Sequence, residues 1–283
     1  MAEPLSRLSA LASGLDHPEG VAWAPDGNVY ATGEAGQVYR VSLADGKFTQ
    51  IGSSGGYGLG IAADAASNLY VCDMGVKAVV RVKQDGSAST YSRGASEEPL
   101  TVPNFPVFDA AGNLYVSNSG AWTGRNGHIQ RIDARGKASV WSRQAAGFTN
   151  GLALSSDGRF LYVVESTPPL ISRIAITANG SAGAYEVVAE LPSTVPDGIA
   201  FDSSGALYVA CYAPDRIYRI APGGKPEVLF DDWTRMSLNA PTNLAFAGPN
   251  LGRLLVANLG GYNLVSAELG VRGMPLHYPR LEA

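Results

Sequence analysis

Short apolar segments that alternate with turn residues recur along the whole chain, and no stretch longer than about ten residues shows a helical period. Each repeat consists of a short apolar strand, a turn containing Asp, Gly or Asn, and a second strand of the type Leu-Tyr-Val. Turns of this composition between two β-rich runs predict a hairpin. The six copies occupy residues 17–33, 57–73, 102–118, 148–165, 195–211 and 240–258.

Two further strand-like runs follow each hairpin, as in residues 36–43 and 47–53. Six units of four strands, each some 40 to 47 residues long, predict an all-β fold, a six-bladed β-propeller that forms a single domain over residues 1–283. A β-sandwich is the structural alternative, but sandwich sequences do not repeat one hairpin six times. We expect residues 5–13 to add a strand to the last blade and so close the ring.

A polar residue recurs near the start of the first strand of each repeat. In a propeller this strand lines the central channel, so equivalent positions form a ring around the axis. Five of the six ring positions are Glu, Asp or Asn, although their neighbours in the strand are apolar. The ring consists of Glu19, Leu59, Asn104, Asn150, Asp197 and Asn243.

Buried carboxylates and amides are costly without partners, and carboxylates that face each other repel. A hard divalent cation resolves both problems, because Ca²⁺ takes about six to eight oxygen ligands. The ring therefore predicts one axial divalent cation. Ca²⁺ is favoured, with Mn²⁺ and Mg²⁺ as alternatives and Zn²⁺ less suited because none of the three His lies on the ring. The alternative is a wet channel whose polar residues bind only water.

Several segments carry a resemblance to a known family: HPEG (17–20), residues 148–165, residues 195–202 and LGVRGMPLHYP (269–279). Here the chain resembles the senescence marker protein (regucalcin)/gluconolactonase/luciferin-regenerating-enzyme-like superfamily of calcium-dependent propeller lactonases. The resemblance implies that Glu19, Asn150 and Asp197 bind the metal. It associates Asn104 with metal-bound water and substrate, and Asp197 with the general base.

Two positions depart from the sugar-lactonases of that family, which commonly carry Arg and Asp around the third-blade Asn. Here these positions are Val102 and Phe105. We therefore expect an apolar, aromatic mouth and a substrate less polar than a sugar lactone. The predicted substrate-binding residues are Asn104, Phe105, Trp122, Phe148 and Tyr212, with Tyr57 and Tyr262 as further aromatic candidates.

Some residues near the ring have two interpretations. His17 is either a proton shuttle or a residue that caps a loop, and His128 looks peripheral. Glu165 and Asp73 belong to a second ring, three residues after the repeated Tyr, where structural hydrogen bonding between blades is favoured over orientation of metal ligands. Gly198 leaves room for water to approach the carboxylate of Asp197. Cys72 and Cys211 are expected to be buried structural thiols.

Composition narrows the function classes. The 21 Lys and Arg against 25 Asp and Glu give a net charge of −4, which removes the electrostatic case for nucleic acid or an anionic membrane. No run of 18 apolar residues and no signal peptide is evident, so we expect a cytoplasmic protein. A small-molecule substrate is expected, and no obligatory protein partner is evident.

The leading functional hypothesis is a metal-dependent hydrolase that opens a lactone, with Asp197 as general base and Glu19 mainly a metal ligand. A second hypothesis keeps the site but replaces the lactone by an aryl ester or a phosphotriester. A third is a non-catalytic propeller that binds a partner through one face. The ring argues against the third, because an interaction module needs no axial metal.

Overall fold

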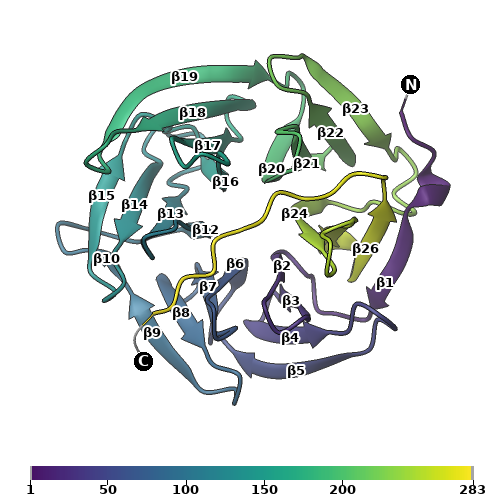
Figure 1. Cartoon of the computed structure of the whole chain (residues 1–283), viewed down its shortest axis with the longest axis horizontal. Helices are drawn as coiled ribbons and strands as arrows, with labels where there is room; N and C mark the ends of the chain where they lie inside the picture. The colour runs from purple at the N-terminus through teal and green to yellow at the C-terminus, as the bar shows by residue number, and fades with distance from the viewer. Residues whose placement is uncertain (1, 282–283) are drawn as a thin grey trace.

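Six four-stranded antiparallel sheets surround a central axis in the computed structural model, which describes residues 2–281 (Figure 1). This arrangement confirms the predicted six-bladed β-propeller. In five of these six sheets the strand order follows the chain from the innermost strand outward, whereas in the sixth the N-terminal strand is outermost. Blades 1 to 3 consist of β2 (Val21–Trp23), β3 (Val29–Thr32), β4 (Gln37–Val41) and β5 (Phe48–Ser53); β6 (Gly58–Ala63), β7 (Leu69–Asp73), β8 (Ala78–Val82) and β9 (Ala88–Ser92); and β12 (Pro103–Phe108), β13 (Leu114–Asn118), β14 (His128–Ile132) and β15 (Ala138–Ser142).

The other three blades follow the same plan. They consist of β16 (Thr149–Leu154), β17 (Phe160–Glu165), β18 (Leu170–Ile176) and β19 (Ala182–Glu190); β20 (Val195–Phe201), β21 (Leu207–Ala213), β22 (Arg216–Ile220) and β23 (Pro226–Asp231); and β24 (Pro241–Ala247), β25 (Arg253–Asn258), β26 (Asn263–Glu268) and β1 (Ser9–Ser13). A small hairpin of β10 (Gly94–Ala95) and β11 (Glu98–Pro99) lies between blades 2 and 3, and two short 3₁₀ turns are η1 (Leu5–Arg7) and η2 (Leu259–Gly261).

The ring closes where the sequence predicts. The N-terminal strand β1 pairs antiparallel with β26, so one blade contains both ends of the repeat array. In Figure 1 the purple first strand lies beside the yellow last one. β1 is the outermost strand of blade 6 and completes its four-stranded sheet.

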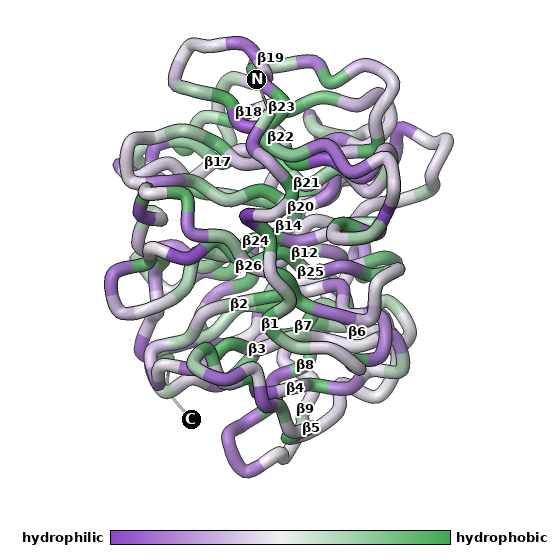
Figure 2. The backbone as a smooth tube through the Cα atoms, turned by 90° about the vertical axis from the view of Figure 1, so that its right-hand side faces the viewer, coloured by the Kyte–Doolittle hydropathy of each residue, from purple (hydrophilic) through white to green (hydrophobic). Residues whose placement is uncertain are grey.

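The core lies between neighbouring blades and consists mainly of Val, Leu, Ile, Ala and Tyr from the inner strands. One cluster joins blades 5 and 6 around Phe230 and Leu254, and another joins blades 1 and 6 around Leu15 and Leu255. Figure 2 shows this distribution, with hydrophobic residues inside and hydrophilic turns at the periphery. Cys72 and Cys211 are free and buried, as predicted.

The C-terminal segment 269–281 crosses one end of the central channel (Figure 1). Its backbone bonds to turns that end the innermost strands: Ser203 donates to the carbonyl of Arg272, and Ala65 donates to that of Pro279. Gly273 forms a β-bridge with Asp202. This segment therefore closes the end of the channel where the innermost strands finish. No helix within residues 2–281 is long and apolar enough to cross a membrane.

Candidate metal and active site

The predicted ring residues lie at the opposite end of the channel, where the innermost strands begin. Glu19 precedes β2, while Asn104, Asn150 and Asp197 lie within the first three residues of β12, β16 and β20. All four are buried, with exposed fractions of 4 to 8%. The C-terminal segment covers the far end of the channel, so this layer lies nearer the uncovered end, which is formed by the loops between blades.

Four oxygen atoms of the ring have no hydrogen-bond partner among the described residues. They are Asn104 Oδ1, Asn150 Oδ1, Asp197 Oδ1 and Asn243 Oδ1. A buried acceptor without a partner costs about 1–3 kcal/mol, so four in one layer indicate an electrophilic partner supplied from outside the chain. The donor set of carboxylate and amide oxygens fits a hard divalent cation, and it contains neither His nor Cys.

Asn243 is the polar ring residue that the sequence-based ligand set omitted. Its Nδ2 donates to both Glu19 Oε2 and the Glu19 carbonyl oxygen, each at 3.0 Å. Thr242 also donates to that carbonyl through its hydroxyl, at 2.8 Å. Blade 6 therefore fixes Glu19 of blade 1, and it leaves Asn243 Oδ1 as a fourth partnerless oxygen. The repeat alignment predicts the ring position of Asn243, but it does not predict the contact of Asn243 with Glu19.

The two carboxylates of the ring are hard to ionise together in the polypeptide alone. Burial, followed by the charge of Asp197, raises the pKa of Glu19 well above its ordinary value, while the Asn243 amide lowers it. Burial raises the pKa of Asp197 to about 7, and a hydrogen bond with Asn150 opposes that rise. A cation would reverse the balance by favouring the ionised forms. No group of three or more His, Cys, Asp and Glu side chains within residues 2–281 is placed to hold a metal ion, so a cation here would depend on the amides as well.

Glycine directly after a ring residue lets neighbouring blades approach closely. A Cβ on Gly151 would lie 2.5 Å from the carbonyl oxygen of Asp197, and one on Gly198 would lie 2.7 Å from Asn243 Oδ1. The space beside Gly198 is thus filled by blade 6. The prediction that it leaves room for water beside Asp197 is wrong, because its missing side chain serves packing between blades.

A second layer surrounds the approach to the ring, two residues before each ring position. Five of its members are half-buried and Pro241 is buried. The layer is apolar or aromatic except for His17, and it consists of His17, Tyr57, Val102, Phe148, Val195 and Pro241. Burial raises the pKa of Tyr57 to about 12, with smaller contributions from the charges of Glu34, Glu19 and Tyr212. A substrate reaching the ring would therefore pass apolar side chains.

Two contacts between aromatic side chains lie at this mouth. Trp122, which is 46% exposed, contacts Phe148 with ring centroids 4.7 Å apart. His17 contacts Tyr262 at 4.2 Å, and its Nδ1 lies 3.0 Å from both Asp16 Oδ1 and Glu34 Oε2. Tyr212 is 41% exposed at the end of β21. The structure thus brings Trp122, Phe148 and Tyr212 to the same end of the propeller as the ring.

Phe105 lies elsewhere. Its side chain is 9% exposed and belongs to the core cluster that includes Tyr115 and Leu152. Successive residues of a strand face opposite sides, so a channel-facing Asn104 turns Phe105 toward the neighbouring blade. A Cβ on Gly60 would lie 2.9 Å from its ring, which shows how closely blade 2 packs there. The expected place of Phe105 in the mouth is therefore wrong.

The second ring anchors the loops that carry the mouth residues. Asp73 accepts backbone hydrogen bonds from Gly56 and Tyr57, and Glu165 accepts them from Ala146 and Gly147. These bonds fall within one blade, between its second strand and the loop before its first. The expected hydrogen bonding between blades is instead made by hydroxyls such as that of Ser166, which donates to the carbonyl of Pro196.

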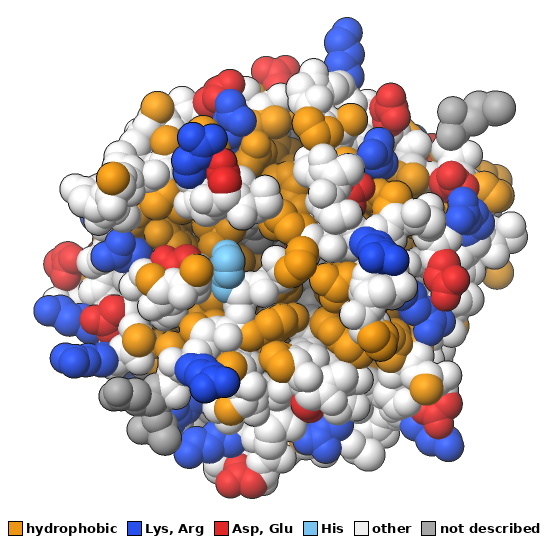
Figure 3. Space-filling model, viewed as in Figure 1, with side chains coloured by type: hydrophobic (Ala, Val, Ile, Leu, Met, Phe, Trp, Pro, Cys, Tyr) orange, Lys and Arg blue, Asp and Glu red, His pale blue; other side chains and the backbone are white. Residues whose placement is uncertain are grey.

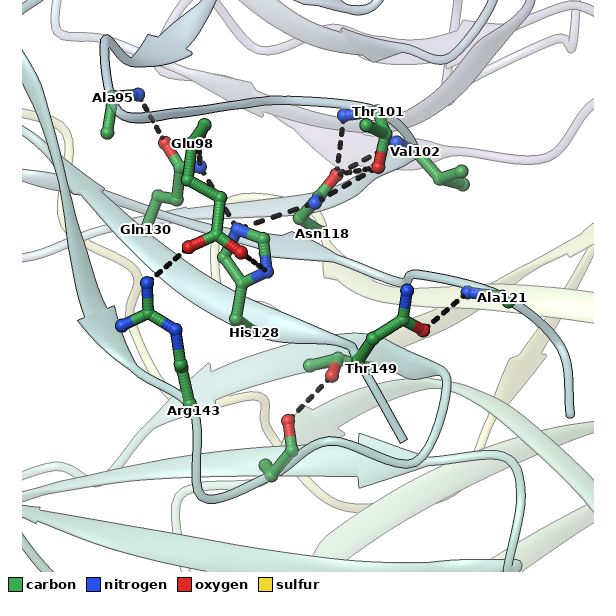
Figure 4. Close-up of polar contacts among 12 residues, drawn as sticks. Ala95, Glu98, Thr101, Val102, Asn118, Ala121, His128, Gln130, Arg143 and Thr149 are labelled. Carbon is green, nitrogen blue, oxygen red and sulfur yellow. Dashed lines mark hydrogen bonds and ion pairs between the residues drawn. The ribbon is translucent and has the colours of Figure 1, made fainter. Parts of the chain in front are cut away.

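His128 is buried rather than peripheral, because it belongs to a polar network under the β10–β11 hairpin (Figure 4). Its Nε2 lies 3.1 Å from the amide nitrogen of Gln130, and its Nδ1 lies 3.5 Å from Glu98 Oε1. Burial lowers the pKa of His128, and the charge of Glu98 opposes this. Asn118 lies beside it and accepts hydrogen bonds from the backbone of Thr101 and Val102. This network fixes the loop that leads to Asn104.

Comparisons with known proteins agree with this architecture. A 6-deoxy-6-sulfogluconolactonase of Pseudomonas putida is 26% identical over 235 residues, covering 79% of this chain and 76% of that protein. The structure of a gluconolactonase from Xanthomonas campestris superposes with a TM-score of 0.79 at 20% identity, covering 94% of this chain and 89% of that one. A calcium-binding protein, regucalcin, from Agrobacterium tumefaciens gives a TM-score of 0.77 at 18% identity, with 97% of both chains covered.

The family assignment depends on a family model, since structural likeness at such identities shows the fold alone. Residues 17–259 match the model described as the SMP-30/Gluconolactonase/LRE-like region, and this span contains all six ring positions. The chain therefore belongs to the SMP-30/gluconolactonase/LRE-like family.

Proposed function

We propose that this protein is a divalent-metal-dependent hydrolase that opens lactones, with Ca²⁺ as the favoured cation. The observation that carries the proposal is the layer of four buried, partnerless oxygens beside Glu19. Lactonases among the relatives support the reaction class, and the regucalcin described as calcium-binding supports the choice of cation.

The ring residues would have two roles, to hold the cation and to accept a proton. Glu19, Asn104, Asn150 and Asp197 would hold the cation, and Asn243 supplies a further oxygen at the same level. When bound, the cation would polarise the lactone carbonyl and offset the negative charge that develops on its oxygen. Asn104 would also orient the substrate or the attacking water.

Asp197 is the better candidate for the general base. One of its oxygens has no partner, whereas Oε2 of Glu19 already accepts a hydrogen bond from Asn243. Asp197 would accept a proton from the water that attacks the carbonyl carbon. The acyl carbon–oxygen bond of the lactone would then break, the departing oxygen would take up the proton from Asp197, and the product would retain both halves as one hydroxy acid.

The apolar mouth favours lactones with alkyl or aryl substituents over free sugar lactones. Trp122, Phe148 and Tyr212 would contact such substituents, and Val102 takes the place where sugar-handling relatives carry Arg. The relative from Pseudomonas putida is, by its name, a lactonase for a sulfogluconolactone. This chain would therefore share its chemistry but differ in the polarity of its substrate.

The test combines metal analysis of the purified protein with a pH-indicator assay of γ- and δ-lactones. Chelated protein would be assayed alone and after addition of Ca²⁺, Mn²⁺, Mg²⁺ or Zn²⁺. We expect one divalent cation per chain and lactone opening that chelation abolishes and the cation restores. Phenyl acetate and paraoxon in the same assay cover the aryl-ester and phosphotriester alternative, and their faster turnover would assign the site to them. Bound cation without turnover of any substrate would support a binding module instead.

A further inference from the structure

Five blades repeat a cross-strand pair of Tyr and Arg between their second and third strands. The pairs are Tyr30 and Arg40, Tyr70 and Arg81, Tyr115 and Arg131, Tyr162 and Arg173, and Tyr208 and Arg219. Since the five arginines occupy equivalent positions, their partners can be compared directly. This repeat therefore provides an internal control for what each guanidinium binds.

Four of the five arginines have a partner within the chain. Arg40 donates to Gln84 at 2.7 Å, and Arg173 donates to Glu186 at 2.7 Å. The remaining two, Arg131 and Arg219, face the carbonyl of Gly180 and the carboxylate of Asp202. Arg81 is the exception: its Nε is buried and has no partner among residues 2–281. A buried donor in that state is costly, which indicates a ligand.

Arg81 lines a groove of about 540 Å³ between blades 2 and 3, together with Arg135 and Arg280. The hydroxyl-bearing Ser89 and Thr90 of β9 also line it. None of the ion pairs within residues 2–281 involves any of these three arginines. Figure 3 shows basic side chains at the lower left of the face crossed by the C-terminal segment, where Figure 1 places β8 and β9.

The walls of this groove are held by specific contacts. The hydroxyl of Tyr91 donates to the carbonyl of Asp133 at 2.8 Å and so joins β9 to the turn that carries Arg135. The segment that carries Arg280 is held by the bond from Ala65 to Pro279, at 2.9 Å. The fold therefore places all three arginines along one groove.

Nearby carboxylates are occupied elsewhere. Asp64 accepts hydrogen bonds from Asn68 and from the hydroxyl of Tyr70. Asp133 accepts backbone hydrogen bonds from Arg135 and Lys137 in its own turn. Neither carboxylate forms an ion pair with the groove arginines, so the guanidinium groups have no direct carboxylate partner among residues 2–281.

We infer that this groove binds a small tetrahedral oxyanion, namely phosphate, sulfate or a phosphate monoester. Guanidinium groups bind such oxygens through paired, charge-assisted hydrogen bonds, and the Ser and Thr hydroxyls can add neutral ones. The volume suits a small molecule. The groove is lined by outer strands of blade 2, a turn of blade 3 and the C-terminal segment, and it contains no ring residue, so it is independent of the proposed lactonase site.

The test measures binding of inorganic phosphate, sulfate and glycerol 3-phosphate to the full chain by calorimetry at constant ionic strength. Measurements with chelator present leave the axial ring with its two carboxylates and no cation, which keeps anions from that site. We expect one saturable site per chain. A tighter complex with glycerol 3-phosphate would identify a monoester, whereas equal affinities would identify the free oxyanion.

Single Arg→Ala substitutions would show whether the anion binds in this groove. Arg135→Ala and Arg280→Ala remove exposed side chains, and each is expected to weaken binding about tenfold. Arg272→Ala is the matched control, because it removes the same charge from the same C-terminal segment outside the groove; it should change affinity less than twofold. Lactone opening should be unchanged in all three variants. Absence of saturable binding, or an equal loss in Arg272→Ala, would overturn the inference and would leave the proposed lactonase function untouched.

Discussion

The two ends of the channel differ in whether their polar groups have hydrogen-bond partners. At the end closed by the C-terminal segment, turn backbones are paired: Met274 donates to Phe201, and Gly273 donates to Leu251. At the ring end, four side-chain oxygens are buried without partners and two carboxylates raise each other's cost of ionisation. The same six strands connect both ends, so the difference arises from the side chains and from the segment that covers one end.

From this contrast we expect the covered end to contribute to stability and the ring end to contribute to chemistry. The covered end gains hydrogen bonds and apolar burial between residues that are distant in sequence. The ring end retains polar atoms at a cost that only a ligand would remove. Variants at the ring should therefore change activity and metal dependence, whereas variants under the C-terminal segment should change thermal stability and leave activity intact.

The largest effect is expected at Asp197. Asp197→Asn keeps the size and one oxygen ligand but removes the proton acceptor. At saturating Ca²⁺ it should retain metal and lose roughly 10²–10⁴ in kcat, which is the usual worth of general-base catalysis. Steady-state kinetics and metal analysis of the same preparation measure both quantities.

Glu19→Gln is the matched control for this prediction. It should raise the cation concentration needed for activity, and added cation should restore much of the rate. A metal-loaded Asp197→Asn variant that stays within a few-fold of wild type would move the base assignment to Glu19 or His17.

The second prediction concerns pH and metal removal. The pKa of Asp197 is raised to about 7 in the folded chain, from 3.8. A raised acid contributes stability that is full below its unfolded pKa and is lost as pH rises through the folded pKa, so stability of chelated protein should fall between pH 4 and 7. The change is on the order of 4 kcal/mol for this group. Thermal melting with EDTA should show this slope, and millimolar Ca²⁺ should flatten or reverse it. An unchanged slope with Ca²⁺ would argue against a cation at the ring.

A third prediction tests the covered end. A Cβ on Gly273 would lie 2.1 Å from Cβ of Phe246, so Gly273→Ala must displace the C-terminal segment. Overpacking of this kind costs about 1–3 kcal/mol, which lowers Tm by several degrees. Leu276→Ala, at an exposed position of the same segment, should leave Tm nearly unchanged. A large loss of kcat in Gly273→Ala with unchanged Tm would show that the two ends are not separate.

Much of the fold and of the ring could be predicted because each blade is a local repeat. The hairpin signal of residues 195–211 lies within one short stretch, and register alone placed Asp197 in line with Glu19. The C-terminal segment could not be placed, because residues 269–281 have no strand period and bond to turns far away in sequence. The burial of Phe105 and His128 and the packing role of Gly198 depend on the neighbouring blade or on a loop hairpin, which a repeat alignment does not show.

The smallest expected effect is on substrate choice at the mouth. Trp122 is 46% exposed and contacts Phe148, so Trp122→Ala removes apolar contact without opening the core. Apolar pockets discriminate by only about 1–3 kcal/mol for a methylene-sized difference. We therefore expect about a tenfold loss of kcat/KM for alkyl and aryl lactones and little change for gluconolactone. Trp233→Ala, at an aromatic residue that is 87% exposed and outside the layer before the ring, serves as the control and should change neither. If wild-type enzyme has a higher kcat/KM for gluconolactone than for every alkyl or aryl lactone tested, the apolar mouth does not select the substrate, and Asn104 and the ring alone would then set specificity.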